Sequence, residues 1–194
     1  MIKGNIELVS FNDELHKYFY EGKELKGITT TISKVCGKSF PRTTRTELAC
    51  SYGSQIHKEC ERWINEGVEP CMSDSIWVKN KLIELMNKYP IGTTVYNSEL
   101  RVSDFEGTAS NVDIVLHTTE GVILMDIKTG KFDRNYCTWQ LNAYRLMYEN
   151  CYPEKVIGML ILNTKSKCIF PIGTRDNDSI LWLLEKNKNG KVEE

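Results

Sequence analysis

The run from Val122 to Ile127 constrains the fold more than any other part of the sequence. Its first four residues, Val-Ile-Leu-Met, are all apolar, so no polar position alternates with them. This pattern is typical of a strand in the middle of a sheet, where other elements cover both faces. The rest of the chain is therefore expected to place helices on the two sides of this strand.

The segments around that run alternate between strand-like and helix-like patterns. A hairpin is expected at 6–10 and 16–20, followed by a short helix at 28–35. Strands are expected at 94–102, 112–117, 122–127, 156–162 and 168–172, and helices at 43–66, 73–86, 135–150 and from 177 onward. The core order, α-β-β-β-α-β, predicts an α/β fold in which helices flank a mixed central sheet.

The length of 194 residues favours a single domain over 1–194. It would consist of an N-terminal hairpin and short helix (1–40), a core (43–172), and a C-terminal helix and tail (177–194). The formal net charge of -1 excludes a protein that coats nucleic acid by bulk charge, but not one with a local basic patch. The sequence also predicts no membrane span and no secretory leader.

The seven cysteines are irregularly spaced, and no pair is separated by only two residues. This arrangement favours free thiols in a reducing, cytoplasmic compartment and disfavours a zinc knuckle. Cys60 lies three residues from His57 on the same expected helix, so a thiol–imidazole pair is one alternative. No oxyanion device or third orienting group accompanies it, and a packed thiol explains Cys60 better.

Asp126 and Lys128 are the first candidates for chemistry. They are two residues apart on the expected strand, so both side chains leave the same face of the sheet. A carboxylate and an ammonium at the end of an apolar strand are costly unless they serve a function. Their spacing alone nevertheless favours an ordinary surface ion pair.

Other polar residues are individually uninformative. His57 and Glu61 are four residues apart and share one helix face, yet a lone helical histidine is more often packed or solvated. Glu99 lies near a strand end, Gln140 resembles an exposed helix amide, and Tyr144 one turn later resembles a core aromatic. Only their order along the chain is informative.

That order resembles the PD-(D/E)XK nuclease superfamily, in particular phage-type exonucleases related to the RecB nuclease domain. The resemblance extends from about residue 16 to about residue 162. It is carried by Gly53-x-x-x-His57, Glu99, Gly107-Thr-Ala, Asp126-Ile-Lys128-Thr-Gly and Gln140-x-x-x-Tyr144. It implies a metal-dependent deoxyribonuclease in which Mg²⁺ or Mn²⁺ lowers the pKa of the attacking water and neutralises charge on the phosphate.

The resemblance also implies roles for most of the matching polar residues, and it places Glu99 among the catalytic residues without a specific role. Asp126 and the backbone carbonyl of Ile127 would be metal ligands, and His57 would lie near the metal. Lys128 would position the attacking water or stabilise the developing charge. Gln140 and Tyr144 would orient Lys128 or the DNA backbone.

Ser110 departs from the family pattern, because relatives carry a metal-binding aspartate three residues after the glycine of Gly-Thr-Ala. A hydroxyl is a far poorer ligand for a hard dication than a carboxylate. Three explanations are open: an engineered replacement of aspartate by serine, a degenerate, binding-only member, or a ligand supplied by Asp113 instead. Strand alternation disfavours the third, because positions 110 and 113 face opposite sides unless a bulge or local twist intervenes.

Contacts to DNA would come from local basic residues that neutralise phosphates without reading sequence, namely Arg42, Arg45, Lys131 and Arg134. The resemblance implies a phage or prophage protein in the cytoplasm of a bacterial host, working beside a single-strand annealing or binding protein. Some relatives hold an iron–sulfur cluster on clustered cysteines. Here Cys151 and Cys168 are isolated from each other, which disfavours a cluster. The alternative function is a nuclease fold kept only for binding DNA or a protein.

Overall fold

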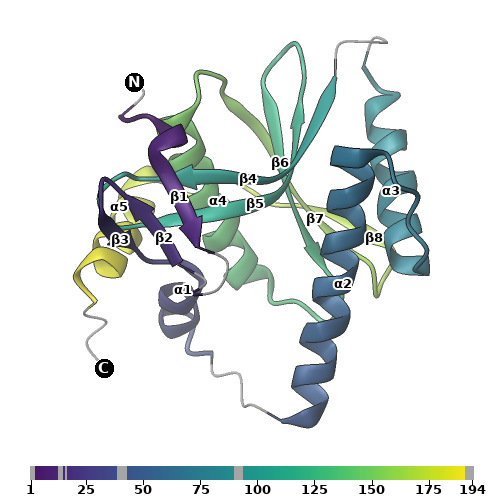
Figure 1. The fold of residues 1–194 in the computed structure, drawn as a ribbon, viewed down its shortest axis with the longest axis horizontal. Coiled ribbons are helices and arrows are strands. Elements are labelled where there is room, and N and C mark those ends of the chain that lie inside the picture. Colours follow the sequence, from purple (N-terminus) through teal and green to yellow (C-terminus); the bar gives the residue numbers. More distant parts are fainter. Residues whose placement is uncertain (1–2, 13–14, 16, 39–42, 90–93, 191–194) are drawn as a thin grey trace.

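The structure of the protein is a computed structural model, which describes residues 3–12, 15, 17–38, 43–89 and 94–190 (Figure 1). Within these residues, five strands form a mixed sheet in the order β4-β5-β6-β7-β8. Neighbouring strands are antiparallel except for β6 and β7, which are parallel. The strands are β4 (Val95–Ser103), β5 (Ala109–His117), β6 (Val122–Lys128), β7 (Val156–Asn163) and β8 (Cys168–Pro171).

The apolar run that begins at Val122 is the middle strand of this sheet, β6. Val122, Leu124 and Met125 are fully buried. Because β6 and β7 are parallel, the chain must cross over between them, and α4 (Arg134–Cys151) makes that connection. The prediction of a mixed α/β fold with helices around a central sheet is confirmed.

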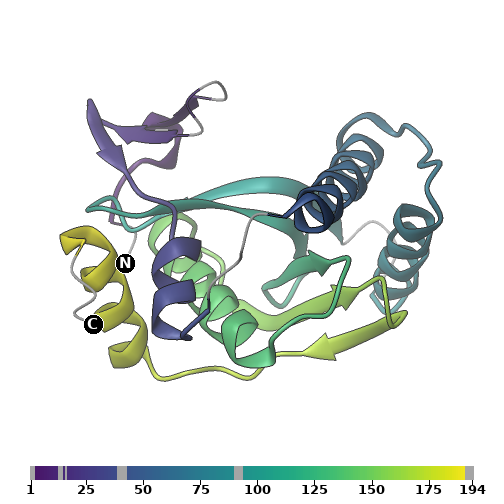
Figure 2. The same ribbon diagram turned by 90° about the horizontal axis from the view of Figure 1, so that it is seen from below.

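Helices cover both faces of the sheet (Figure 2). On one face, α4 lies against the strands, and α1 (Thr29–Val35) and α5 (Asn177–Asn189) pack with α4 in the core that contains Val115 and Leu124. On the other face, α2 (Thr44–Glu66) and α3 (Ser73–Met86) pack on Ile114 and Met125. None of the helices in the described part of the chain is long and apolar enough to span a membrane.

The long helix α2 begins and ends where its sequence predicts. Thr43 and Thr46 exchange side-chain and backbone hydrogen bonds in a capping box at its start. Gly67 ends it in the left-handed conformation, with φ of 71°. This helix carries His57, and the neighbouring Ile56 and Cys60 pack it into the core that contains Ile114 and Met125.

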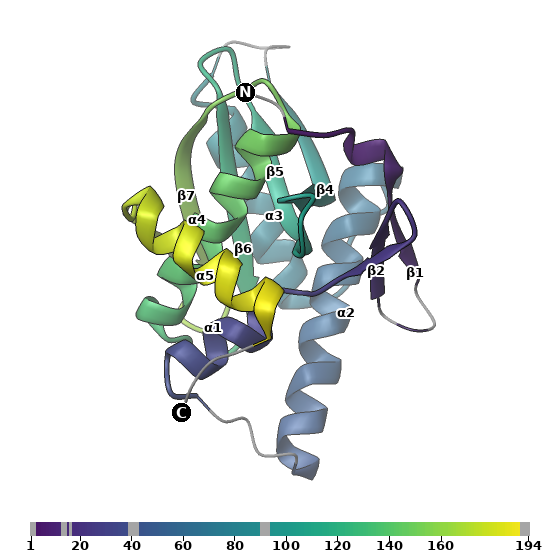
Figure 3. The ribbon, with the colours of Figure 1, turned by 90° about the vertical axis from the view of Figure 1, so that its left-hand side faces the viewer.

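The N-terminal region forms a small antiparallel sheet rather than the two-stranded hairpin that the sequence predicts. After a 3₁₀ turn (Ile6–Leu8), its described strands are β1 (Val9–Asn12), β2 (Lys17–Tyr20) and β3 (Lys23–Leu25). The third strand forms because Glu21 and Gly22 both have positive φ and reverse the chain tightly. Figure 3 shows this sheet beside β4, where Arg101 donates a hydrogen bond of 2.6 Å to the Val9 carbonyl.

Candidate metal centre

Carboxylates from three neighbouring strands form a row across the sheet. The β4–β5 ladder pairs the residues on either side of Glu99 with those on either side of Asp113, so these two side chains are opposite each other. The β5–β6 ladder ends at the pair Ile114 and Met125, and the same register continues to Asp113 and Asp126. Glu99, Asp113 and Asp126 are therefore cross-strand neighbours on β4, β5 and β6.

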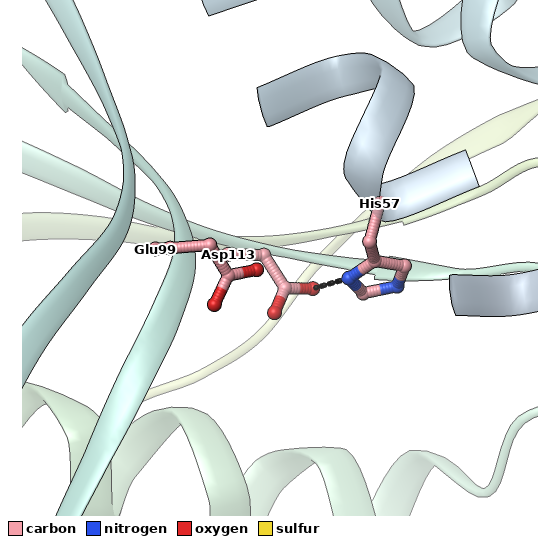
Figure 4. A group of neighbouring side chains, drawn as sticks. All are labelled: His57, Glu99 and Asp113. Carbon is pink, nitrogen blue, oxygen red and sulfur yellow. Dashed lines mark ion pairs between the residues drawn. The ribbon is translucent and has the colours of Figure 1, made fainter. Parts of the chain in front are cut away.

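Helix α2 adds an imidazole to this row. His57 Nδ1 lies 3.4 Å from Asp113 Oδ2, and Figure 4 shows the Asp113 carboxylate pointing to the ring with Glu99 beside it. One ligand atom from each of His57, Glu99 and Asp113 lies within 4.8 Å of the others. In the described part of the chain, no other set of three His, Cys, Asp or Glu side chains brings ligand atoms so close together.

The backbone of Ile127 faces the same place. Its N–H donates a hydrogen bond of 2.8 Å to Asp113 Oδ2. The next carbonyl, that of Lys128, points the other way and accepts from Thr164 and Asn163 near the end of β7. Because the N–H and C=O of one strand residue point to the same neighbour, the Ile127 carbonyl is also directed toward Asp113.

The backbone is twisted where Glu99 meets Asp113. Glu99 has a φ of 50°, a left-handed conformation that is uncommon for a residue with a side chain. Residues two apart on β5 consequently join different cores, because Val112 packs with α4 whereas Ile114 packs with α2 and α3. Strained backbone of this kind is often found at functional sites.

This twist revises the interpretation of Ser110. Regular alternation predicts that Asp113 faces away from the site, but the local twist at Glu99 and Asp113 removes that restriction. The β5–β6 register, extended one pair beyond Ile114 and Met125, puts Asp113 and not residue 110 opposite Asp126. Ser110 is paired with Val102 and is buried beside a neighbouring cavity.

Lys128 is held by a chain of polar contacts. Its Nζ lies 2.8 Å from Asp126 Oδ2 and donates a hydrogen bond of 3.1 Å to Gln140 Oε1. Gln140 Nε2 in turn donates to the Tyr144 hydroxyl at 3.0 Å. Since Gln140 and Tyr144 are one turn apart on α4, the helix holds the lysine from the opposite side of the site. The pair of Asp126 and Lys128 is thus not the ordinary surface ion pair that its spacing alone favours.

The charged groups of the site shift one another's pKa values. Burial, and then the charge of Asp113, raises the pKa of Glu99 to about 7. Burial also raises the pKa of Asp126, against the effect of Lys128. Burial opposes the charge of Lys128, but the carboxylates of Asp126 and Asp113 outweigh it and raise the lysine pKa. Asp113 likewise raises the pKa of His57 against the effect of burial.

The other predicted residues are less closely tied to this site. Arg45 lies at the exposed start of α2, Lys131 is exposed just after β6, and Arg134 donates to the Pro171 carbonyl at 2.8 Å. Arg42 lies outside the described residues. Glu61, which shares a helix face with His57, lines the cavity beside Glu99.

Cysteine chemistry finds no support at Cys60. Its side chain is buried, and burial raises the pKa of the thiol to about 12, so the thiol stays protonated at neutral pH. A protonated thiol is a weak nucleophile. All seven cysteines are free.

Sequence reasoning missed a set of residues in the adjacent cavity. Phe11 and Tyr18 on the N-terminal sheet, together with Arg101 and Asn111 on the central sheet, line it beside Glu99. Their positions along the chain contain no motif. The aromatic residues of β2 were the one feature of the sequence that could have indicated this cavity. The sequence alone could not show which element these side chains face.

The left-handed Glu99 leads to a stability prediction. Glu99→Gly should be about 1 kcal/mol more stable to urea than Glu99→Ala, because glycine adopts this conformation without the steric cost of a Cβ. Glu24, a strand residue without positive φ, is the control, and there glycine should be less stable than alanine. Equal unfolding free energies for the two Glu99 variants would contradict the observed twist.

Comparisons with known proteins add little. No family model matches the chain, and no curated protein matches it. A solved structure described as "Crystal structure of SSO0001" is similar with a TM-score of 0.34 and 10% sequence identity, over 84% of this chain and 84% of that one. A similarity of this size carries no information about function, which must be inferred from the side chains themselves.

Proposed function

We propose that the protein is a metal-dependent deoxyribonuclease of the PD-(D/E)XK type, which hydrolyses phosphodiester bonds. The observation that carries the proposal is the row of Glu99, Asp113 and Asp126 with Lys128 beside it. Hydrolysis of a phosphodiester needs a cation near the phosphate, a positioned water and a positive group for the developing charge. The carboxylates can hold the cation, and Lys128 can provide the positive group.

The donor set fits a hard divalent cation. Glu99 and Asp113 offer carboxylate oxygens with ligand atoms close together, and the Ile127 carbonyl is on the side of its strand that faces Asp113. Asp126 is near enough for its charge to interact with Asp113 and His57. Mg²⁺ and Mn²⁺ prefer such oxygen ligands, and His57 adds a nitrogen that Mn²⁺ tolerates better than Mg²⁺. When bound, the cation would lower the pKa of a water and neutralise charge on the phosphate.

Lys128 would act as a fixed positive charge. Its contacts with Asp126 and Gln140 hold the ammonium group in one position, and its raised pKa keeps it protonated. A charged donor that does not have to reorganise during the reaction stabilises a developing negative charge most effectively. Tyr144, through Gln140, would fix the direction of this donor.

The binding-only alternative depended on Ser110 at a ligand position. With Asp113 in the row, the chain retains a carboxylate on each of the three strands, so no observation favours loss of activity. Arg45 and Lys131, both exposed, are the remaining described candidates for phosphate contacts outside the centre. By resemblance to phage-type exonucleases, we further propose that the protein acts in the bacterial cytoplasm beside a single-strand annealing or binding protein.

The direct test is digestion of end-labelled linear DNA, both duplex and single-stranded, by the wild-type protein. Products should appear with Mg²⁺ or Mn²⁺ and disappear when EDTA is added, because the carboxylates alone cannot activate water. A protein that leaves both substrates intact at every metal concentration would refute the enzyme assignment.

Metal binding can be tested without DNA. Mn²⁺ at 100 times its dissociation constant should stabilise the wild-type fold by about 2.7 kcal/mol, a rise in melting temperature of roughly 5–10 °C for a chain of this size. Differential scanning calorimetry measures the shift. Asp113→Asn is the matched comparison and should lose most of this Mn²⁺-induced rise in melting temperature. An equal rise in wild type and Asp113→Asn would place the metal elsewhere.

A further inference from the structure

A cavity opens beside the metal centre. It has a volume of about 780 Å³ and lies between the N-terminal sheet, α1, α2 and the strands β4 and β5. Glu99 belongs to both the cavity wall and the metal centre, so a molecule in the cavity reaches the proposed reaction site directly. Cavities of this size hold a small molecule or a few nucleotides rather than a DNA duplex.

One wall of the cavity is aromatic. Phe11 on β1 and Tyr18 on β2 are direct cross-strand partners, and their ring centroids are 4.6 Å apart at an interplanar angle of 40°. Burial, and then the Glu99 charge, raises the pKa of Tyr18 to about 12, so the ring stays uncharged at neutral pH. A neutral aromatic face is a surface on which any nucleic acid base can stack.

The other walls carry hydrogen-bonding groups and one positive charge. Thr29, Thr30 and Asn111 supply hydroxyl and amide groups. Arg101 uses one guanidinium nitrogen for the Val9 carbonyl, while its buried Nε has no hydrogen-bond partner among the described residues. The negative side chains, Glu61 and Glu99, also line the cavity, and Glu99 is the one shared with the metal centre.

We propose that this cavity binds the end of a single DNA strand, with a base stacked on the Phe11–Tyr18 pair and a neighbouring phosphate beside Glu99. The combination of an aromatic platform with a positively charged group is typical of sites for single-stranded nucleic acid. This inference rests on the proposed function and defines its substrate: the enzyme acts on single-stranded or frayed ends, and the N-terminal sheet determines that preference.

The test uses an oligonucleotide of about eight nucleotides that contains the fluorescent base 2-aminopurine near one end. Binding is measured in Ca²⁺, a dication that takes oxygen ligands and offsets the carboxylates beside the phosphate, and gels confirm that the oligonucleotide stays intact. Tyr18→Leu removes the aromatic face but keeps an apolar side chain, and Tyr18→Phe keeps the face. Phe19→Leu is the matched control, because Phe19 is half-buried on the same strand but does not line the cavity.

Wild type should bind the single strand more tightly than a blunt duplex and should quench the 2-aminopurine fluorescence. Tyr18→Leu should bind about 5- to 100-fold more weakly and lose the quenching, whereas Tyr18→Phe and Phe19→Leu should behave as wild type. Circular dichroism melting of each variant confirms that it is folded.

Two results would overturn the inference while leaving the nuclease proposal intact. The first is Mg²⁺-dependent digestion of DNA by a wild-type protein that binds duplex as tightly as single strand, or binds neither in Ca²⁺. The second is unchanged binding and quenching in Tyr18→Leu. Conversely, Tyr18-dependent binding of single strands by a protein that never cleaves would uphold the cavity and refute the enzyme assignment.

Discussion

Replacing Asp113 with asparagine will reduce metal-dependent DNA cleavage by more than about 100-fold, whereas replacing Ser110 with alanine will leave most of it. The asparagine keeps the size and the hydrogen bond from the Ile127 N–H but loses the charge that a dication requires. Residues that only support a metal ligand typically cost roughly 10- to 100-fold in activity when they are replaced. A larger loss of cleavage rate in Asp113→Asn would identify Asp113 as a direct ligand. The measurement is the initial rate of product formation at saturating Mg²⁺.

Asp113→Asn and Ser110→Asp separate two models of the site. If residue 110 occupied the ligand position, Asp113→Asn would keep most of the activity, and Ser110→Asp would increase it. In the observed arrangement Ser110 is buried beside the cavity, so a new carboxylate there would remain largely uncompensated and should not help. Full activity of Asp113→Asn would contradict the row of carboxylates and, with it, the proposed metal centre.

Lys128→Met should lower the cleavage rate by about 100- to 1,000-fold, the usual effect of removing one positioned donor from a transition-state site. Methionine keeps much of the side-chain volume but has no charge and no N–H to donate. Because Lys128 is not a proposed metal ligand, the thermal shift with Mn²⁺ should remain. Comparable cleavage by this variant and wild type would show that another group stabilises the developing charge.

The same substitution has a measurable effect on stability. Without Lys128, the buried carboxylate of Asp126 loses its ion-pair partner, so the metal-free protein should be destabilised by about 1–3 kcal/mol. Lys17→Met, which breaks an exposed pair with Glu24, is the control and should cost well under 1 kcal/mol. Mn²⁺ should restore part of the loss at Lys128 and none at Lys17, because only Asp126 lies beside the proposed metal.

Much of the fold follows from local patterns. The uninterrupted apolar run from Val122 predicts the buried strand β6, and Gly67 predicts the end of α2. These predictions hold because backbone periodicity and left-handed caps depend on a few adjacent residues. The third N-terminal strand was missed because β3, of three residues, is too short to show a period and depends on pairing with β2.

The candidate site likewise has features that follow from local sequence and features that depend on tertiary packing. The sequence by itself determined that Asp126 and Lys128 share one face of a strand, and that Gln140 and Tyr144 are one helical turn apart, since both facts depend only on local geometry. The tertiary structure decided which carboxylate completes the row. Asp113 takes that place because Glu99, on a strand paired with it, adopts a left-handed backbone and twists the ladder between two separately packed cores. Such a twist depends on the pairing and packing of distant segments, which no short stretch of sequence contains.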